Sequence, residues 1–161
     1  MEIRPATADD LDGVVASSAA LFAEDAATRD SLRNADWPAT HGAQWCSDLL
    51  ADPQALVLVA TVEGEVAGHL VGMFAEPSDM WVGSKAELVS MYVRGDVRGQ
   101  GVGGRLVDAF VEWAKGRGAV RLHVTAYAEN AAALRLYESR GFAPKSVTLA
   151  VDLDPVGRAG T

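Results

Sequence analysis

The residues best suited to chemistry form a glycine-rich turn, Arg98-Gly99-Gln100-Gly101-Val102-Gly103-Gly104. The turn follows an apolar run, Leu88 to Val93, and leads into an amphipathic run, so we expect it to join a strand to the start of a helix. The first N–H groups of a helix have no partner inside it, and glycines let an anion approach them closely. Arg98 adds a forked cationic donor at the rim. The turn therefore predicts a site for a phosphate-bearing ligand.

Two common phosphate-binding folds fit this turn less well. A P-loop needs Lys followed by Ser or Thr after its last glycine, whereas Gly104 is followed by Arg105 and Leu106. The glycines do match the Gly-x-Gly-x-x-Gly of dinucleotide-binding folds, whose ribose-binding acid is expected about 20 residues further on. The next predicted strand, Val120 to Thr125, has no acid after it until Glu129, and too little chain follows for a doubly wound sheet. The context disfavours a nicotinamide cofactor.

Two separate motifs in the sequence match a third class of phosphate-binding protein. Residues Arg98 to Gly103 follow the pattern Arg/Gln-x-x-Gly-x-Gly/Ala, and Asn130 is followed by Tyr137 and then Gly141-Phe142. With these motifs, from about Ile3 to Asp152, the chain resembles the Gcn5-related N-acetyltransferase (GNAT) superfamily. The resemblance implies a GNAT-like fold, acetyl-CoA (coenzyme A) as the cofactor, and an acetyl-CoA-dependent N-acyltransferase activity.

The resemblance also implies roles for individual residues. Tyr137 lies seven residues, two helical turns, after Asn130, so both side chains face one ligand. Tyr137 is similar to the family's general acid, which protonates the leaving sulfur, and Asn130 to a contact of the pantetheine arm. The alternative is that Tyr137 packs in the core and Asn130 caps its helix. The residues predicted to bind the cofactor are Met91, Tyr92, Val93, Arg98, Gly99, Gln100, Gly101, Val102, Gly103, Gly104, Asn130, Leu134 and Tyr137.

Glu87 is the candidate catalytic base, because the attacking amine must lose a proton. Strand alternation predicts that Glu87, Val89, Met91 and Val93 share one face. Histone-acetylating members of the superfamily place their catalytic glutamate at this offset. The alternatives are that Glu87 is a solvated acid at a strand end, and that water serves as the base.

Charge is distributed unevenly along the chain. From Pro5 to Ser84 there are 13 acids against two arginines, whereas from Lys85 onward there are 11 bases against 8 acids. This pattern favours an anionic cofactor on the second half and a cationic acceptor on the first, although surface acids also serve solubility alone. The residues predicted to bind the acceptor are Glu24, Asp25, Asp30, Asp36 and Trp37.

Hydrophobic periodicity predicts the elements that position these residues. It favours a single α/β (α+β layered) domain at residues 1–154 and a C-terminal tail at 155–161. The resemblance implies that helices flank a central mixed, mostly antiparallel twisted sheet. The predicted strands are Glu2 to Pro5, Ala55 to Val62, Val66 to Phe74, Lys85 to Val93, Val120 to Thr125 and a final pair across Phe142 to Leu153. The predicted helices run over Ala8 to Ala26, Ala39 to Ala51, Val102 to Gly116, and from Asn130 past Tyr137.

Composition disfavours several other kinds of protein and ligand. The lone Cys46 excludes an internal disulfide, and with no export signal or membrane span in view we expect a cytoplasmic protein. The three histidines lack metal-ligand spacing, and a pI near 4.8 disfavours nucleic acid. The resemblance implies acetyl transfer to a primary amine, and the acidic first half favours one on a small cationic metabolite or an amine-bearing antibiotic. Because Cys46 lies far from the motifs and has no evident histidine partner, we expect direct transfer in a ternary complex. The alternatives are a lysine or N-terminal amine of a peptide or protein, and a non-catalytic acyl-CoA sensor. A homodimer is also compatible with the resemblance, since relatives often pair through late strands or helices.

Overall fold

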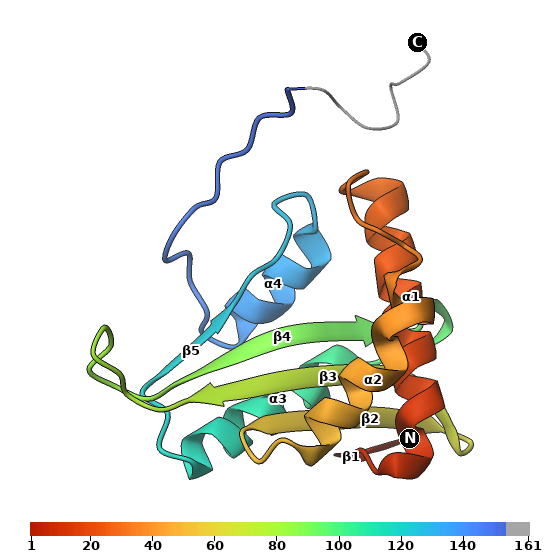
Figure 1. Cartoon of the computed structure of the whole chain (residues 1–161), viewed down its shortest axis with the longest axis horizontal. Coiled ribbons are helices and arrows are strands. Elements are labelled where there is room, and N and C mark those ends of the chain that lie inside the picture. The colour runs from red at the N-terminus through yellow and green to blue at the C-terminus, as the bar shows by residue number, and fades with distance from the viewer. Residues whose placement is uncertain (154–161) are drawn as a thin grey trace.

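The computed structural model describes residues 1–153, whose five strands form one twisted sheet in the order β1-β2-β3-β4-β5 (Figure 1). Neighbouring strands are antiparallel except β4 and β5, which are parallel and connected through a helix. The predicted fold class, a mixed and mostly antiparallel sheet flanked by helices, is confirmed. The strands are β1 (Glu2–Pro5), β2 (Ala55–Val62), β3 (Glu65–Ala75), β4 (Lys85–Val93) and β5 (Arg121–Val124).

Helices cover both faces of the sheet. The α-helices are α1 (Leu11–Thr28), α2 (Trp37–Ala51), α3 (Val102–Gly116) and α4 (Ala131–Ser139), with short 3-10 turns at Ala8–Asp10 and Gly95–Val97. Helices α1 and α2 pack on one face around Val14 and Cys46. Helices α3 and α4 pack on the other face, where Leu106 and Phe110 are fully buried. Burying each such side chain stabilises the fold by roughly 1.5–3 kcal/mol.

Strand β4 contains a bulge that reverses its alternation. Val71 of β3 pairs with Ser90, but the next residue, Gly72, pairs with Leu88, so Val89 is an extra residue. Leu88 before the bulge and Met91 after it therefore both pack on the α3–α4 side. Glu87 alternates with Leu88 and so faces the α1–α2 side. The prediction that Glu87 shares a face with Met91 and Val93 is wrong, because it assumed an unbroken two-residue period.

Strand β4 is paired with β5 over only part of its length. Their register runs from Lys85↔Arg121 to Leu88↔Val124, whereas β4 continues to Val93. Beyond Leu88, β4 and the chain that follows β5 diverge, as Figure 1 shows, and this edge of β4 pairs with no strand in the described residues. This opening in the sheet lies directly before the glycine-rich turn.

The prediction of a final pair of strands across Phe142 to Leu153 is wrong, because the described residues of this range form no strand. After α4 the chain runs as an extended segment that pairs with no strand, and residues 143–153 are exposed (Figure 1). A strand forms only where an edge accepts its backbone hydrogen bonds. The predicted tail at 155–161 lies outside the described residues. No helix in the described part of the chain is long and apolar enough to span a membrane.

Candidate active site

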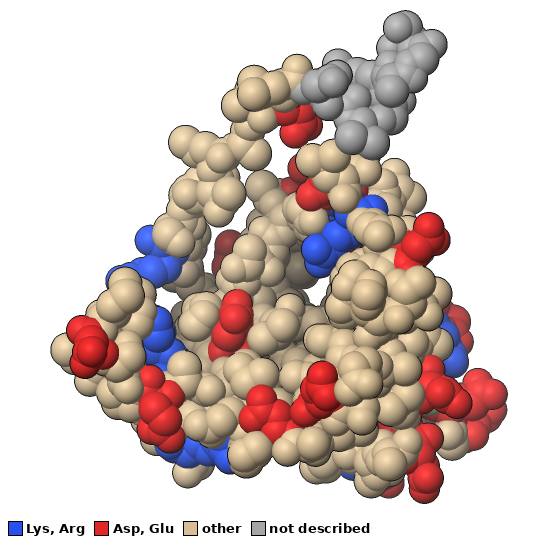
Figure 2. Space-filling view, viewed as in Figure 1, with Lys and Arg blue, Asp and Glu red and all other residues tan. Residues whose placement is uncertain are grey.

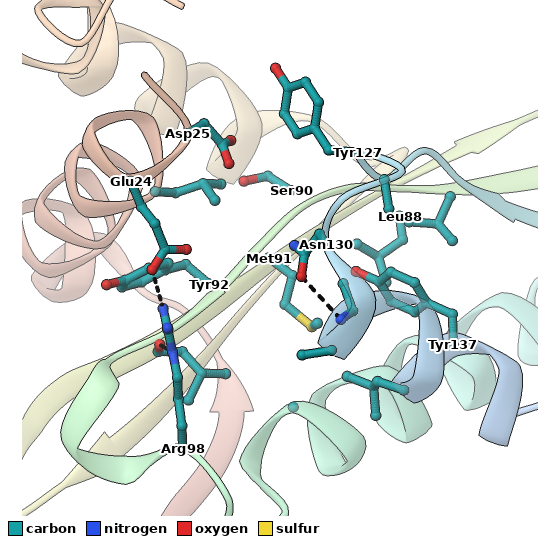
Figure 3. A pocket seen from close by; sticks show the side chains of 18 of the residues that line it. Glu24, Asp25, Leu88, Ser90, Met91, Tyr92, Arg98, Tyr127, Asn130 and Tyr137 are labelled. Carbon is teal, nitrogen blue, oxygen red and sulfur yellow. Dashed lines mark hydrogen bonds and ion pairs between the residues drawn. The ribbon is translucent and has the colours of Figure 1, made fainter. Parts of the chain in front are cut away.

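A cavity of about 450 Å³ occupies the opening between β4 and β5. Its walls come from the end of α1, the second half of β4, the glycine-rich turn, the loop after β5 and one face of α4. Figure 3 shows α4 with Asn130 and Tyr137 on one side, α1 with Glu24 and Asp25 on the other, and β4 between them. The fold thus brings together the turn, the Asn130 helix and the acidic end of α1.

The glycine-rich turn ends at the N-terminus of α3, as predicted. Gly99 and Gly101 have φ of +77° and +82°, left-handed values that favour glycine. The backbone N–H groups from Gly99 to Gly104 donate to no acceptor in the described part of the chain. A Cβ on Gly103 would lie 3.0 Å from the Leu136 side chain of α4. The turn therefore offers unpaired donors and the positive end of a helix dipole in a tightly packed cradle.

Arg98 connects the turn to α1. Its Nε donates to the Val93 carbonyl at 2.8 Å, and one terminal nitrogen lies 3.0 Å from the Glu24 carboxylate (Figure 3). Glu24 also pairs with Arg29 at 3.1 Å. Burial opposes the charge of Glu24, but the hydrogen bonds from Arg98 and Arg29 outweigh it and hold its pKa below the ordinary value. The Glu24 carboxylate is therefore ionised at neutral pH.

Tyr137 is 7% exposed and lines the cavity from α4. Its ring packs edge-on against Phe142, with centroids 5.9 Å apart, so the core fixes its position. The hydroxyl makes no hydrogen bond to any described residue. Burial raises the pKa of Tyr137 to about 12. The cavity is therefore lined by a phenol that remains protonated at every physiological pH.

Most of the other residues predicted to bind the cofactor line the cavity, and two do not. Asn130 lines the cavity, and its side chain also caps α4 by accepting from the Ala133 N–H at 3.2 Å. Met91, Tyr92, Val93 and the turn residues Arg98, Gly99, Gly101, Val102, Gly103 and Gly104 line the cavity as well. Gln100 and Leu134 do not line it. Gln100 is exposed, and α4 turns Ala133 and Leu136 toward the cavity in place of Leu134.

Of the five residues predicted to bind the acceptor, only Glu24 and Asp25 line the cavity. Asp25 is buried and pairs with Arg29 at 2.9 Å. Asp30 accepts from the Tyr127 hydroxyl at 3.1 Å, which joins the α1–α2 connection to the loop after β5. Asp36 and Trp37 begin α2, where Trp37 stacks on Phe22 with ring centroids 5.4 Å apart. Asp30, Asp36 and Trp37 therefore shape the rim and the helix packing rather than the cavity wall.

Glu87 does not line the cavity, because the β4 bulge turns it to the opposite face. Its carboxylate lies 3.9 Å from the Nε2 atom of His123 on β5, and its side chain is 43% exposed. This places a carboxylate and an imidazole together beside the point at which β4 and β5 separate.

A buried hydrogen-bonded chain, absent from the sequence prediction, lies behind the cavity. His69 of β3 is fully buried, with Nδ1 2.6 Å from the Ser17 hydroxyl of α1 and Nε2 2.8 Å from the Ser90 hydroxyl of β4. Burial lowers the pKa of His69 to about 4, so the imidazole is neutral. Ser90 itself lines the cavity. The chain ties α1, β3 and β4 together, and no local motif marks it because its members are 52 and 21 residues apart.

Comparisons with known proteins agree with this geometry. An aminoglycoside N(6')-acetyltransferase type 1 from Klebsiella aerogenes is 31% identical over 103 residues, which are 62% of this chain and 66% of that protein. An uncharacterised N-acetyltransferase of Bacillus subtilis, YobR, is 39% identical over 59 residues, which are 37% of this chain and 24% of that protein. The chain thus spans less than two thirds of the length of either relative.

Solved structures share the fold. A tetramutant of the BH1408 protein from Bacillus halodurans superposes with a TM-score of 0.84 at 20% identity, covering 95% of this chain and all of that one. The aminoglycoside N-acetyltransferase AAC(6')-Iy, solved in complex with CoA, superposes with a TM-score of 0.73 at 13% identity, covering 96% of this chain and 100% of that one. The model of the acetyltransferase (GNAT) family matches residues 21–142. The predicted family is therefore confirmed, and the chain belongs to the acetyltransferase (GNAT) family.

Proposed function

We propose that this protein is an acetyl-CoA-dependent N-acetyltransferase that acts on a small amine. The observation that carries the proposal is the opening between β4 and β5, which joins unpaired amides at the α3 N-terminus to a buried, protonated tyrosine. The amides at the α3 N-terminus can bind a diphosphate, and the Tyr137 hydroxyl can donate a hydrogen bond to a leaving thiolate.

The residues of the cavity fit coenzyme A. The amides from Gly99 to Gly104 are free to receive a diphosphate, and a side chain at Gly103 would press on Leu136. The edge of β4 from Ser90 to Val93, which pairs with no strand in the described residues, offers backbone groups to an amide-bearing arm, apart from the Val93 carbonyl that accepts from Arg98. When bound, acetyl-CoA supplies an activated acetyl thioester.

Tyr137 is the proposed acid. A phenol with a pKa of about 12 is neutral at pH 7 and donates a hydrogen bond to a sulfur that gains charge. The hydroxyl has no competing acceptor among the described residues, so it is free to serve the leaving group. The packing of its ring against Phe142 holds the donor in place without movement of α4.

Glu87 is the proposed base, acting from the α1–α2 face. An amine that enters between α1 and β4 approaches the opening from that face, on which alternation places the Glu87 side chain. The side chain is part-exposed, so a water molecule can carry the proton to it. The Nε2 atom of His123 lies 3.9 Å from the same carboxylate.

The acceptor is proposed to be a small cationic amine, such as an amine-bearing antibiotic, rather than a peptide. Glu24 and Asp25 place two carboxylates on the wall of the cavity, where they pair with Arg98 and Arg29. The Tyr127–Asp30 hydrogen bond joins the loops above them. Figure 2 shows mostly acidic side chains over the face that α1 and α2 cover. The similarity to an aminoglycoside acetyltransferase supports the same substrate class.

Release of free CoA from acetyl-CoA, measured with a panel of polyamines, aminoglycosides and lysine peptides, tests this proposal. Turnover with a small polycation, and little with peptides, supports it. Turnover with peptides alone would mean that the acceptor is a peptide amine rather than a small amine. Tight CoA binding without turnover on any amine would instead favour a non-catalytic acyl-CoA sensor.

A further inference from the structure

The buried hydrogen-bonded chain of Ser17, His69 and Ser90 reaches the cavity at Ser90. Ser90 is the first residue after the β4 bulge. Because the next residue, Met91, packs on the α3–α4 side, Ser90 faces the α1–α2 side. Figure 3 shows the Ser90 hydroxyl on the side of β4 that faces α1. The bulge thus places a hydroxyl on the face from which the amine is proposed to enter.

The neutral ring of His69 leaves the Ser90 oxygen able to accept a further hydrogen bond. A neutral imidazole has one N–H donor and one acceptor nitrogen, so His69 donates to one of its two serines and accepts from the other. If Nε2 carries the hydrogen, it donates to Ser90, whose oxygen keeps one lone pair. If Nδ1 carries the hydrogen, Ser90 donates to Nε2 and its oxygen keeps both lone pairs. In either tautomer, the Ser90 oxygen has a lone pair left for a donor in the cavity.

No other side chain in the described part of the protein occupies that lone pair. The Ser90 hydroxyl bonds there only to His69, whereas the acidic side chains of the cavity wall that α1 supplies are already paired with Arg98 and Arg29. The hydroxyl is also fixed, because His69 is fully buried and rotation of its ring would break both of its hydrogen bonds. The cavity therefore has a fixed oxygen with spare accepting capacity where β4 faces α1.

We infer that Ser90 binds the acceptor nitrogen and that His69 is the residue that positions Ser90. The Ser90 oxygen accepts a hydrogen bond from one N–H of the amine, which orients the nitrogen lone pair toward the acetyl carbon. This inference rests on the proposed N-acetyl transfer.

The hydrogen bond to Ser90 leaves one N–H of a neutral primary amine for proton transfer. The nitrogen lone pair forms the bond to the acetyl carbon, and the proton of this second N–H passes through water to Glu87. The C–S bond breaks, and its electron pair stays on the sulfur, to which Tyr137 donates a hydrogen bond. Ser90 itself neither gains nor loses a proton. A primary amine therefore has enough N–H groups for both Ser90 and Glu87, whereas a neutral secondary amine has one too few.

Steady-state kinetics on the full chain tests the inference with two variants of Ser90. The acceptor is whichever polyamine, aminoglycoside or lysine peptide of the panel above turns over fastest, together with its N-methyl derivative at the acetylated nitrogen. We expect Ser90→Ala to lower kcat/KM for the primary amine by about tenfold or more, the effect of losing one hydrogen bond to a reacting group. The KM for acetyl-CoA should stay within about twofold, and Ser90→Thr, which keeps the hydroxyl, should retain most of the activity.

The N-methyl derivative separates binding of an N–H group from a structural role of Ser90. The parent chain should prefer the primary amine, and this preference should fall about fivefold or more in Ser90→Ala, because the variant no longer uses the additional N–H. A structural role would lower both rates equally. In the Ser90→Ala background, His69→Gln should change kcat/KM for the amine by less than about twofold, since His69 acts through Ser90.

Two neighbouring serines of α1 supply a matched control. Ser17 and Ser18 are both buried, but only Ser17 bonds to His69, and the Ser18 hydroxyl has no partner among the described residues. Ser17→Ala should lower kcat/KM for the amine by about threefold, and Ser18→Ala should leave it unchanged. Circular dichroism checks that each variant is folded. Should Ser90→Ala fail to fold, the preference for the primary amine is compared between Ser17→Ala and Ser18→Ala instead.

Two results would overturn the assignment of Ser90 while acetyl transfer itself stands: full turnover of the primary amine by Ser90→Ala, or an equal loss for the primary and N-methyl amines. A parent chain that acetylates no amine would overturn the proposed function, and this inference with it.

Discussion

Removing the hydroxyl of Tyr137 while keeping its ring separates the chemistry of this residue from its packing. Tyr137→Phe retains the edge-on contact with Phe142 and removes an oxygen that has no hydrogen-bond partner among the described residues. Loss of an unpartnered buried hydroxyl costs little or nothing in stability. We therefore expect an unchanged melting temperature and an unchanged Kd for CoA. A truncation to alanine would instead cost about 3–5 kcal/mol.

The expected loss of activity follows from the pKa of this tyrosine. A pKa of about 12 lies roughly 3.5 units above that of an ordinary thiol, so complete proton transfer to a free thiolate is uphill by about 5 kcal/mol. The hydroxyl acts mainly as a hydrogen-bond donor to the leaving sulfur. Loss of one such donor typically lowers kcat by about 10²–10³.

Steady-state kinetics over pH 6–10 is the assay. Because the raised pKa keeps the Tyr137 proton in place, we expect no fall in kcat near pH 10, where an ordinary tyrosine would lose its proton. A kcat of Tyr137→Phe within twofold of the parent value would refute the acid role. So would a loss of activity that is matched by a loss of CoA binding.

Three further predictions test other parts of the account. The folded-state pKa of His69, about 4, lies below the ordinary value, so its contribution to stability is present above pH 6.5 and is lost as pH falls toward 4. Urea unfolding should show a loss of roughly 2–3 kcal/mol between pH 7 and 4.5 from this residue, and a smaller loss in His69→Gln. Gly101→Ala should lower the free energy of unfolding by about 1–2 kcal/mol through its positive φ, whereas Gly95→Ala, with open space and no positive φ, should change it far less. Glu87→Gln should lower kcat/KM by about 10² or more, whereas Glu112→Gln on the exposed α3 surface should leave it unchanged.

Local sequence signals predicted most of the elements. Strands β1, β2 and β4 have the predicted bounds, because short segments rich in β-branched and other apolar residues end near clear turn residues. The turn from Arg98 to Gly104 and the capped start of α4 were predictable for the same reason, since each depends on residues a few positions apart.

Non-local features were not predictable in this way. The bulge at Val89 depends on pairing with β3, and no residue type in β4 marks it, so Glu87 was assigned to the wrong face. Glu24 meets Arg98 across 74 residues, so the predicted acceptor ligand is also a partner of the turn. The pattern from Val147 to Leu153 predicted a strand, but no edge of the sheet pairs with it among the described residues.

Titration of CoA into the full chain by calorimetry tests the central claim, that the unpaired amides of the α3 turn hold a diphosphate. Pantetheine, which lacks the diphosphate and nucleotide, is the control ligand. The account predicts one CoA per chain, with pantetheine bound at least tenfold more weakly. An absence of CoA binding, or equal affinity for both ligands, would contradict it.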